Sequence, residues 1–336
     1  MLGEWSLANV IQQHDEPVHS IAVHPDPQKR LLATASWDHS CKLYDLDRTC
    51  VVATLEGQHK KGLYQVKFAS ATGNTKHLIG TVSSDHTCCL WDTNTGRVVH
   101  TLYGHRDEVN GLSFSPRGAH VATASDDRTI IVWDIDSAKI VRRLAGHRNS
   151  VYGICYEPNA ASDNGGMLAT VSFDWMTLVW DTRAGEVLQA LEGHRDDIIG
   201  VDFSDDGRLM ATGSDDCTCR VWDVRTWKCM TVLRDHDGEV KRVAFSPYSR
   251  VLATTSGDGT AKLWDTKRVG SVDTSAPGAD ADDKNAGTEK WNCVSTMDGH
   301  EDHVFDAAWS STGDFFVTAS HDKKWRLWLP AGDDFS

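Results

Sequence analysis

The residues best suited to chemistry are a His, a Ser and an Asp that recur together along the chain. One such set is His105, Ser125 and Asp127. A His that takes a proton from a hydroxyl while an Asp orients its ring is how a hydrolase activates a nucleophile. The set, however, occurs seven times in 336 residues. A catalyst needs one site with a cleft and a stabilised oxyanion, so the repetition predicts a structural role and no enzymatic activity.

An aromatic residue completes each set, six residues after the Asp, and the His lies upstream, usually in a Gly-His pair. The spacing from His to aromatic is 28 residues in repeats three, five, six and seven, and 30, 32 and 33 in repeats one, two and four. Seven copies of one pattern predict a repeat protein. The copies, each given as His, Asp and aromatic, are His14, Asp38 and Tyr44; His59, Asp85 and Trp91; His105, Asp127 and Trp133; His147, Asp174 and Trp180; His194, Asp216 and Trp222; His236, Asp258 and Trp264; and His300, Asp322 and Trp328.

Each repeat has the pattern of four short strands. In the third repeat, an alternating apolar run after His105 ends at the turn residues Pro116 and Gly118. Residues 121–125 form a run of small and branched side chains, residues 126–128 a tight turn in which Asp bonds its own backbone, and residues 129–133 and 141–144 two further strands. Four antiparallel strands with short links make one propeller blade.

The pattern resembles the WD40 repeat family over nearly the whole chain. The resemblance implies an all-β fold, a single seven-bladed WD40 β-propeller. It also implies that the His, Ser, Asp and Trp of a blade hydrogen-bond one another and lock the link between blades. In blades three and five these sets are His105, Ser125, Asp127 and Trp133, and His194, Ser214, Asp216 and Trp222.

The two ends of the chain are expected to close the ring. Only residues 329–336 follow Trp328, too few for a fourth strand, whereas residues 4–12 precede His14 as a fourth strand precedes each later His. We therefore expect the N-terminal strand to complete the last blade and leave no long open edge. One domain spans 1–336, with blades at about 14–56, 59–103, 105–145, 147–192, 194–234, 236–298 and 300–329 plus strand 4–12.

The blades differ in length on one side. Insertions fall at 25–30, 69–77, 157–166 and 267–290, all on the face opposite the His-containing links. The last is rich in Ala, Asp, Gly and Ser and cannot pack a core. We expect a flexible, solvated loop there, with a partner-docking arm as the alternative.

Composition limits the partners and the compartment. The formal net charge is -14 and no basic block occurs, so direct binding of nucleic acid or of a membrane is not expected. The nine Cys show no C-x-x-C pair, and the first residues lack the features of a secretory signal. We expect a cytoplasmic protein, with nuclear and cytoskeletal or ciliary locations as alternatives, that is not secreted. It would be a monomeric propeller within a larger complex, without cofactor, metal or catalytic residues.

Binding by WD40 proteins often uses the face with the His and Asp links, so the resemblance points to positions that project there. They are aromatic or apolar on some blades and acidic on others, which predicts basic peptide segments with one apolar anchor as partners. The candidate binding residues are Trp37, Tyr64, Glu108, Asp126, Tyr152, Phe173, Asp197, Ile199, Asp215, Glu239, His303 and Phe305.

The favoured function is a non-enzymatic protein–protein interaction scaffold, and three alternatives stay open. W-D-x-R motifs end in Arg183 and Arg225, similar to those of substrate receptors of cullin-4 ubiquitin ligases, where the Arg contacts an adaptor. A centriolar, ciliary or dynein-assembly protein and a subunit of an RNA-processing complex are the other two.

Overall fold

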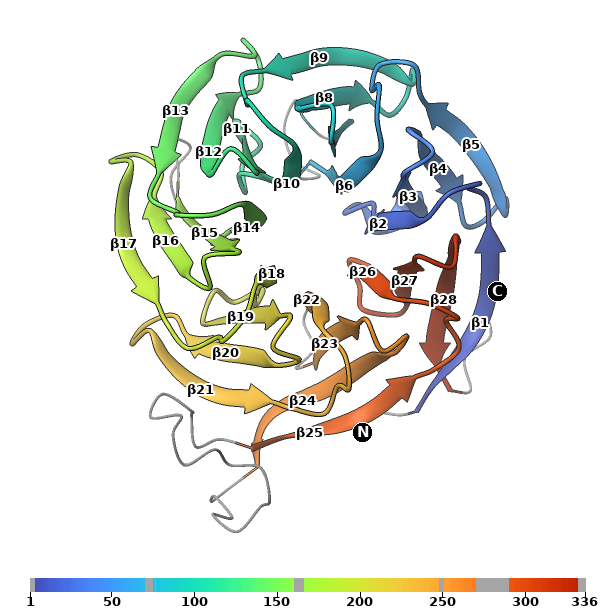
Figure 1. Ribbon diagram of the computed structural model, residues 1–336. Helices are drawn as coiled ribbons and strands as arrows, with labels where there is room; N and C mark the ends of the chain where they lie inside the picture. Colours follow the sequence, from blue (N-terminus) through green and yellow to red (C-terminus); the bar gives the residue numbers. More distant parts are fainter. Residues whose placement is uncertain are drawn as a thin grey trace.

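The structure is a ring of seven four-stranded antiparallel sheets around a central channel (Figure 1). It is a computed structural model that describes residues 4–69, 75, 77–159, 166–247, 251–269 and 290–331. Within these residues every element is a strand except the 3-10 turn η1 (Pro27–Lys29). The expected seven-bladed propeller is confirmed.

Each of the first six blades uses four consecutive strands, the first nearest the channel and the fourth at the outer rim (Figure 1). Blades one to three contain β2 (Val18–Val23), β3 (Leu31–Ser36), β4 (Cys41–Asp45) and β5 (Cys50–Leu55); β6 (Leu63–Phe68), β7 (Leu78–Ser83), β8 (Thr87–Asp92) and β9 (Arg97–Tyr103); and β10 (Val109–Phe114), β11 (His120–Ser125), β12 (Thr129–Asp134) and β13 (Ile140–Ala145). Blades four to six contain β14 (Val151–Tyr156), β15 (Met167–Ser172), β16 (Thr177–Asp181) and β17 (Glu186–Leu191); β18 (Ile198–Phe203), β19 (Leu209–Ser214), β20 (Cys219–Asp223) and β21 (Lys228–Leu233); and β22 (Val240–Phe245), β23 (Val251–Ser256), β24 (Ala261–Val269) and β25 (Lys290–Met297).

The seventh blade joins both ends of the chain. It contains β26 (Val304–Trp309), β27 (Phe316–Ser320), β28 (Lys324–Pro330) and, as its outer strand, β1 (Trp5–Gln12). β1 pairs antiparallel with β28 from Trp5 opposite Pro330 to Gln12 opposite Lys324. Closure by the N-terminal strand is therefore confirmed.

The core lies between neighbouring blades. Ile130 and Val132 of blade three pack with Val151 and Leu168 of blade four, all of them buried. Burying one such side chain contributes about 1.5–3 kcal/mol, so each blade depends on the next one. Glycine in the inner strands allows neighbouring blades to approach closely at the channel. A Cβ on Gly111 would lie only 2.5 Å from the carbonyl oxygen of Tyr152 in the next blade.

The links define two faces of the ring. We call the side that carries the His-containing links and the Ser-x-Asp turns the His face, and the other side the opposite face. The insertion at 25–30 contains η1, whose Asp26 side chain accepts a hydrogen bond from the Gln28 amide. The insertions expected at 69–77, 157–166 and 267–290 lie largely outside the described residues, which omit 70–74, 76, 160–165 and 270–289.

Candidate functional site

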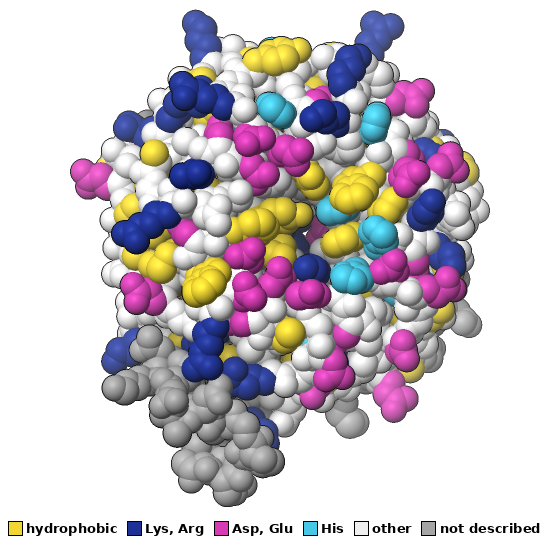
Figure 2. All heavy atoms as spheres, viewed as in Figure 1, with side chains coloured by type: hydrophobic (Ala, Val, Ile, Leu, Met, Phe, Trp, Pro, Cys, Tyr) yellow, Lys and Arg dark blue, Asp and Glu magenta, His cyan; other side chains and the backbone are white. Residues whose placement is uncertain are grey.

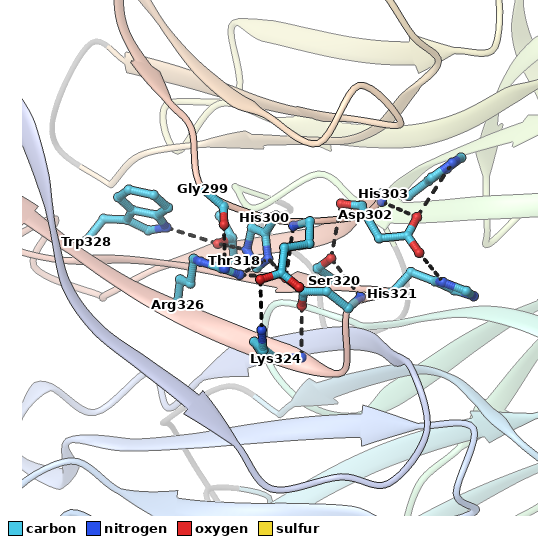
Figure 3. Close-up of polar contacts among 12 residues, drawn as sticks. Gly299, His300, Asp302, His303, Thr318, Ser320, His321, Lys324, Arg326 and Trp328 are labelled. Carbon is cyan, nitrogen blue, oxygen red and sulfur yellow. Dashed lines mark hydrogen bonds and ion pairs between the residues drawn. The ribbon is translucent and has the colours of Figure 1, made fainter.

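The His and Asp of every blade meet in a repeated polar network. In blade three, His105 Nδ1 lies 2.9 Å from Asp127, and its Nε2 lies 2.8 Å from the hydroxyl of Thr123. Trp133 Nε1 donates to the same hydroxyl over 2.9 Å. Figure 3 shows the equivalent network of blade seven, where Trp328 Nε1 donates to Thr318 over 2.9 Å.

The Ser of each set bonds the turn Asp and the His-containing link, as the resemblance implies, but it contacts neither the His nor the Trp. Ser125 does not bridge His105 and Trp133: its hydroxyl donates to the carbonyl of Asp107 over 3.2 Å and accepts from the amide of Asp127 over 3.1 Å. It therefore shapes the turn, and Ser214 acts in the same way in blade five. The bridge is a Thr two residues earlier, which the sequence analysis missed although every repeat reads T-x-S.

The order Asp–His–Thr is that of an activated hydroxyl nucleophile, but the surroundings exclude this use. The Asp127 carboxylate accepts from His105 Nδ1–H, so Nε2 is left to accept the Thr123 proton. The Thr123 side chain is fully buried, and its oxygen already accepts from Trp133. No substrate atom can reach it, so the network holds the His-containing link onto its blade.

The turn carboxylates are held ionised. Burial alone would raise the pKa of Asp174, but the hydrogen bonds from His147 and from the Arg148 amide lower it to about 2. The pKa of Asp38 is also lowered to about 2, against the effect of burial, by His14 and Ser40. Stability gained in this way depends on the carboxylates staying charged.

The His face is hollowed at the channel, where a cavity of about 220 Å³ opens. Six of the candidate binding residues line it: Tyr64, Tyr152, Phe173, Ile199, Asp215 and Phe305. Figure 2 shows hydrophobic side chains gathered around this opening, with acidic side chains over blades five and six and His side chains over blades seven and one.

The aromatic rings at this mouth pack against one another. His19 stacks on Phe305 with ring centroids 4.2 Å apart and on Trp37 at 5.0 Å, and it meets Tyr64 edge-on at 5.4 Å. Burial and the nearby His321 lower the pKa of His19 to about 3, so its ring is neutral at physiological pH. His19 thus lies between Trp37 and Phe305, two of the candidate binding residues.

A second group of rings continues this surface. Tyr64 lies 6.5 Å from Tyr152, which stacks on Phe173 at 5.6 Å. An aromatic surface therefore runs from blade seven through blades one and two to blade four. The side chains of Trp37 and Trp175 remain 41% and 50% exposed, so two indoles on this face are open to a partner.

Some acidic candidate residues accept hydrogen bonds from neutral side chains, and others lie beside a lysine. Glu108 accepts from the Tyr64 hydroxyl over 2.6 Å and Asp126 from Asn110 over 2.6 Å, so both already have a donor. In blades five and six, Lys241 lies 3.1 Å from Asp215 and 3.9 Å from Glu239.

Acidic charge accumulates over blades five and six. Burial, and next the neighbouring Asp196, raise the pKa of Asp197 against a hydrogen bond from Trp175. Burial also raises the pKa of Asp215 against the charge of Lys241. Binding of a cationic group would reduce the electrostatic repulsion among these carboxylates.

The remaining candidates lie beside the cavity or on the opposite face. His303 lies 3.9 Å from Asp302, which also binds His321 Nδ1 at 2.7 Å (Figure 3). Arg183 and Arg225 are exposed in the β16–β17 and β20–β21 turns. Arg183 lies 3.5 Å from Asp181 of its own motif.

Metal sites and membrane-spanning helices are two further features that the described residues could have formed. Among them, no group of three or more His, Cys, Asp or Glu side chains is placed to hold a metal ion. In the same ranges no helix has the length and apolar character needed to cross a bilayer.

The ring of blades and the repeated His–Asp–Thr–Trp network define a closed β-propeller of the repeat type. A family model described as "WD domain, G-beta repeat" matches residues 5–45, 96–134, 138–181, 185–223, 227–265 and 291–328. The chain belongs to the WD40 family, whose members are generally non-enzymatic protein-interaction scaffolds. Strands β6 to β8 of blade two lie outside the matched segments, although this blade has the network of His59, Thr81 and Asp85. No curated protein matches the chain.

Proposed function

We propose that this chain is a non-enzymatic scaffold whose His face binds a basic segment of a partner protein through one apolar anchor. The observation that carries the proposal is the cavity of about 220 Å³ with aromatic walls on one side and Asp215 on the other. Hot spots of protein interfaces combine a buried aromatic pocket with a charged surround.

The two halves of the mouth suit the two parts of such a segment. Tyr64, Tyr152, Phe173 and Phe305 offer an apolar pocket for one side chain. Asp197 and Glu239 lie on the neighbouring blades, where negative charge favours a Lys or Arg next to the anchor. The rings are already held in place by stacking on one another, so binding would cost little side-chain conformational entropy.

Affinity purification of the tagged chain from its own host tests the proposal. The variant carries Trp37→Ala, Tyr152→Ala and Phe305→Ala, and the matched control carries Val52→Ala, Val99→Ala and Val141→Ala on exposed outer strands. Proteins retained by wild type and control but lost from the variant are the expected result. Partners that persist on the variant would remove the His face from consideration.

A ubiquitin-ligase adaptor is the second candidate partner. Exposure of both Arg183 and Arg225 on turns of neighbouring blades is what favours it. The double variant Arg183→Ala, Arg225→Ala should then lose the adaptor of a cullin-4 ligase while keeping partners of the His face. Absence of this adaptor from the wild-type sample would remove the candidate. A centriolar, ciliary, dynein-assembly or RNA-processing complex stays a prediction that the partner identities would test.

A further inference from the structure

The channel has a second mouth on the opposite face, with a chemistry unlike that of the first. A cavity of about 280 Å³ opens there. Val23, Phe68, Phe245 and Trp309 give it apolar walls, and Lys67 and Arg242 reach into it from the inner strands of blades two and six. The volume is close to the lower limit of about 300 Å³ for small-molecule pockets, which suits a group of side-chain size.

The cationic groups of this cavity keep free hydrogen-bond donors. Arg242 Nε lies 3.1 Å from Asp306. Within the part of the chain that the structure describes, neither its terminal guanidinium nitrogens nor the Lys67 ammonium has a protein partner. Burial, and next the charge of Arg242, lower the pKa of Lys67. The half-buried Lys67 ammonium therefore keeps donors that a bound oxyanion can accept from.

The two carboxylates beside the cationic groups already have hydrogen-bond donors. Asp202 lines this cavity, whereas Asp306 lines the cavity of the His face. Asp306 accepts from the Ser20 hydroxyl over 2.6 Å and from the Ile21 amide over 3.1 Å. Asp202 accepts from the Phe245 amide over 2.8 Å and from the Cys155 thiol over 3.5 Å. Neither lies within ion-pair distance of Lys67, so the ammonium is not neutralised by direct contact.

The balance of charge selects the kind of anion. Lys67 and Arg242 face Asp202 and Asp306, so the four groups together carry little net charge when all are ionised. A dianion such as phosphate would add two negative charges to the channel and a monoanion only one, so the monoanion is favoured. The apolar walls add a preference for an anion that carries a hydrocarbon group.

We propose that the mouth on the opposite face is a binding site for a carboxylate monoanion attached to an apolar group, held by Lys67 and Arg242 and packed against Phe245 and Trp309. The carboxylate would accept hydrogen bonds from the Lys67 ammonium and the terminal guanidinium nitrogens. The site goes beyond the proposed function, because it takes an anion on the face that the basic segment does not use; Arg242 is the residue that lines both cavities.

Phenylacetate is a suitable probe, and its binding is measured by ligand-observed saturation-transfer NMR on the full chain. We expect saturable binding at concentrations up to about 10 mM and weaker binding of acetate, which lacks the apolar group. Inorganic phosphate has no non-exchangeable proton to observe, so it is added as a competitor and should not reduce the phenylacetate signal. Lys67→Met should weaken phenylacetate binding at least about tenfold. The control Lys228→Met, an exposed lysine on β21, should bind as wild type does.

Folding of the variant is checked in the same samples. Because Met removes an ammonium that has no direct protein partner, the thermal midpoint of Lys67→Met should stay close to that of wild type. If Lys67→Met does not fold, Lys67→Arg keeps the charge and should retain phenylacetate binding. Wild type that does not bind phenylacetate, or a folded Lys67→Met that binds it equally well, would overturn the proposal.

A competition experiment distinguishes a peptide carboxylate from the carboxylate of a small molecule. A short peptide ending in a free Phe carboxylate should compete with phenylacetate if chain ends are accepted, and its C-terminal amide should not compete. Competition by neither peptide would restrict the site to small carboxylates. Equal competition by the amide would contradict carboxylate recognition.

Discussion

At the scale of single residues, the structure depends on the hydroxyl that joins His to Trp in a blade. Thr123 is fully buried and contacts both His105 and Trp133. The same Thr occurs in every repeat, also in blade one, where Tyr44 replaces the Trp and His14 still lies 2.8 Å from Thr34. A shape-preserving substitution therefore tests the polar network without making a cavity.

The variant Thr123→Val removes the hydroxyl and leaves His105 Nε2 and Trp133 Nε1 without a partner. Each buried unsatisfied group costs about 1–3 kcal/mol, so we expect the free energy of unfolding in urea to fall by about 2–4 kcal/mol. The control Thr54→Val changes an exposed residue of β5 and should shift it by less than about 0.5 kcal/mol. Equal effects of the two variants would contradict the structural role of the network.

The turn carboxylates predict a dependence of stability on pH. The folded pKa of Asp174 is about 2, below its unfolded value of about 3.9. The stabilisation is therefore complete above the unfolded pKa and is lost as pH falls from about 5 towards 2. Thermal midpoints measured by circular dichroism should fall over this range. Asp174→Asn should be less stable at pH 7 and should show a smaller fall, and a pH dependence equal to that of wild type would contradict the assignment.

At the scale of elements, the ring depends on the pairing of β1 with β28. Without β1, β28 becomes an open edge, and Trp5 no longer packs against Trp309, whose ring lies 5.3 Å away. This one strand joins the two ends of the chain, so its loss should destabilise the whole ring.

Deletion of residues 1–12 is therefore expected to lower the thermal midpoint of the entire domain in one cooperative transition. A synthetic peptide of residues 4–12 should restore part of the loss by adding back the strand, and a scrambled peptide should not. An unchanged midpoint after the deletion would show that β1 does not close the ring.

The elements were predictable from the sequence because each repeat combines alternating apolar runs with Ser-x-Asp turns, and because β1 supplies the strand that the last blade lacks. The contacts at the channel mouth could not be predicted from the sequence. The register of each inner strand shifts near its start, for example between Leu63 and Gln65 and between Val151 and Gly153. A bulge re-aims the intervening side chain, so the meeting of Tyr64 with Tyr152 does not follow from their positions in the repeat.

At the scale of the whole molecule, the chain has two channel mouths of different character. The His face combines stacked aromatic rings with carboxylates, and the opposite mouth presents Lys67 and Arg242 among apolar walls. A rigid ring with two such ends can hold two different partners at once, which is what an assembly scaffold requires. The sequence predicted the polarity of the first mouth from its projecting residues, but it missed the second because Lys67 and Arg242 lie within strands.

Selection of peptides from a random displayed library on the wild-type ring tests the central claim most directly. We predict that selected peptides carry Lys or Arg beside an aromatic or large apolar residue. Their affinity should fall at least about tenfold with Tyr152→Ala and also with Asp197→Lys plus Glu239→Lys, and should not change with Lys228→Met. Selected peptides that are acidic, or that bind both His-face variants as tightly as wild type, would contradict the account.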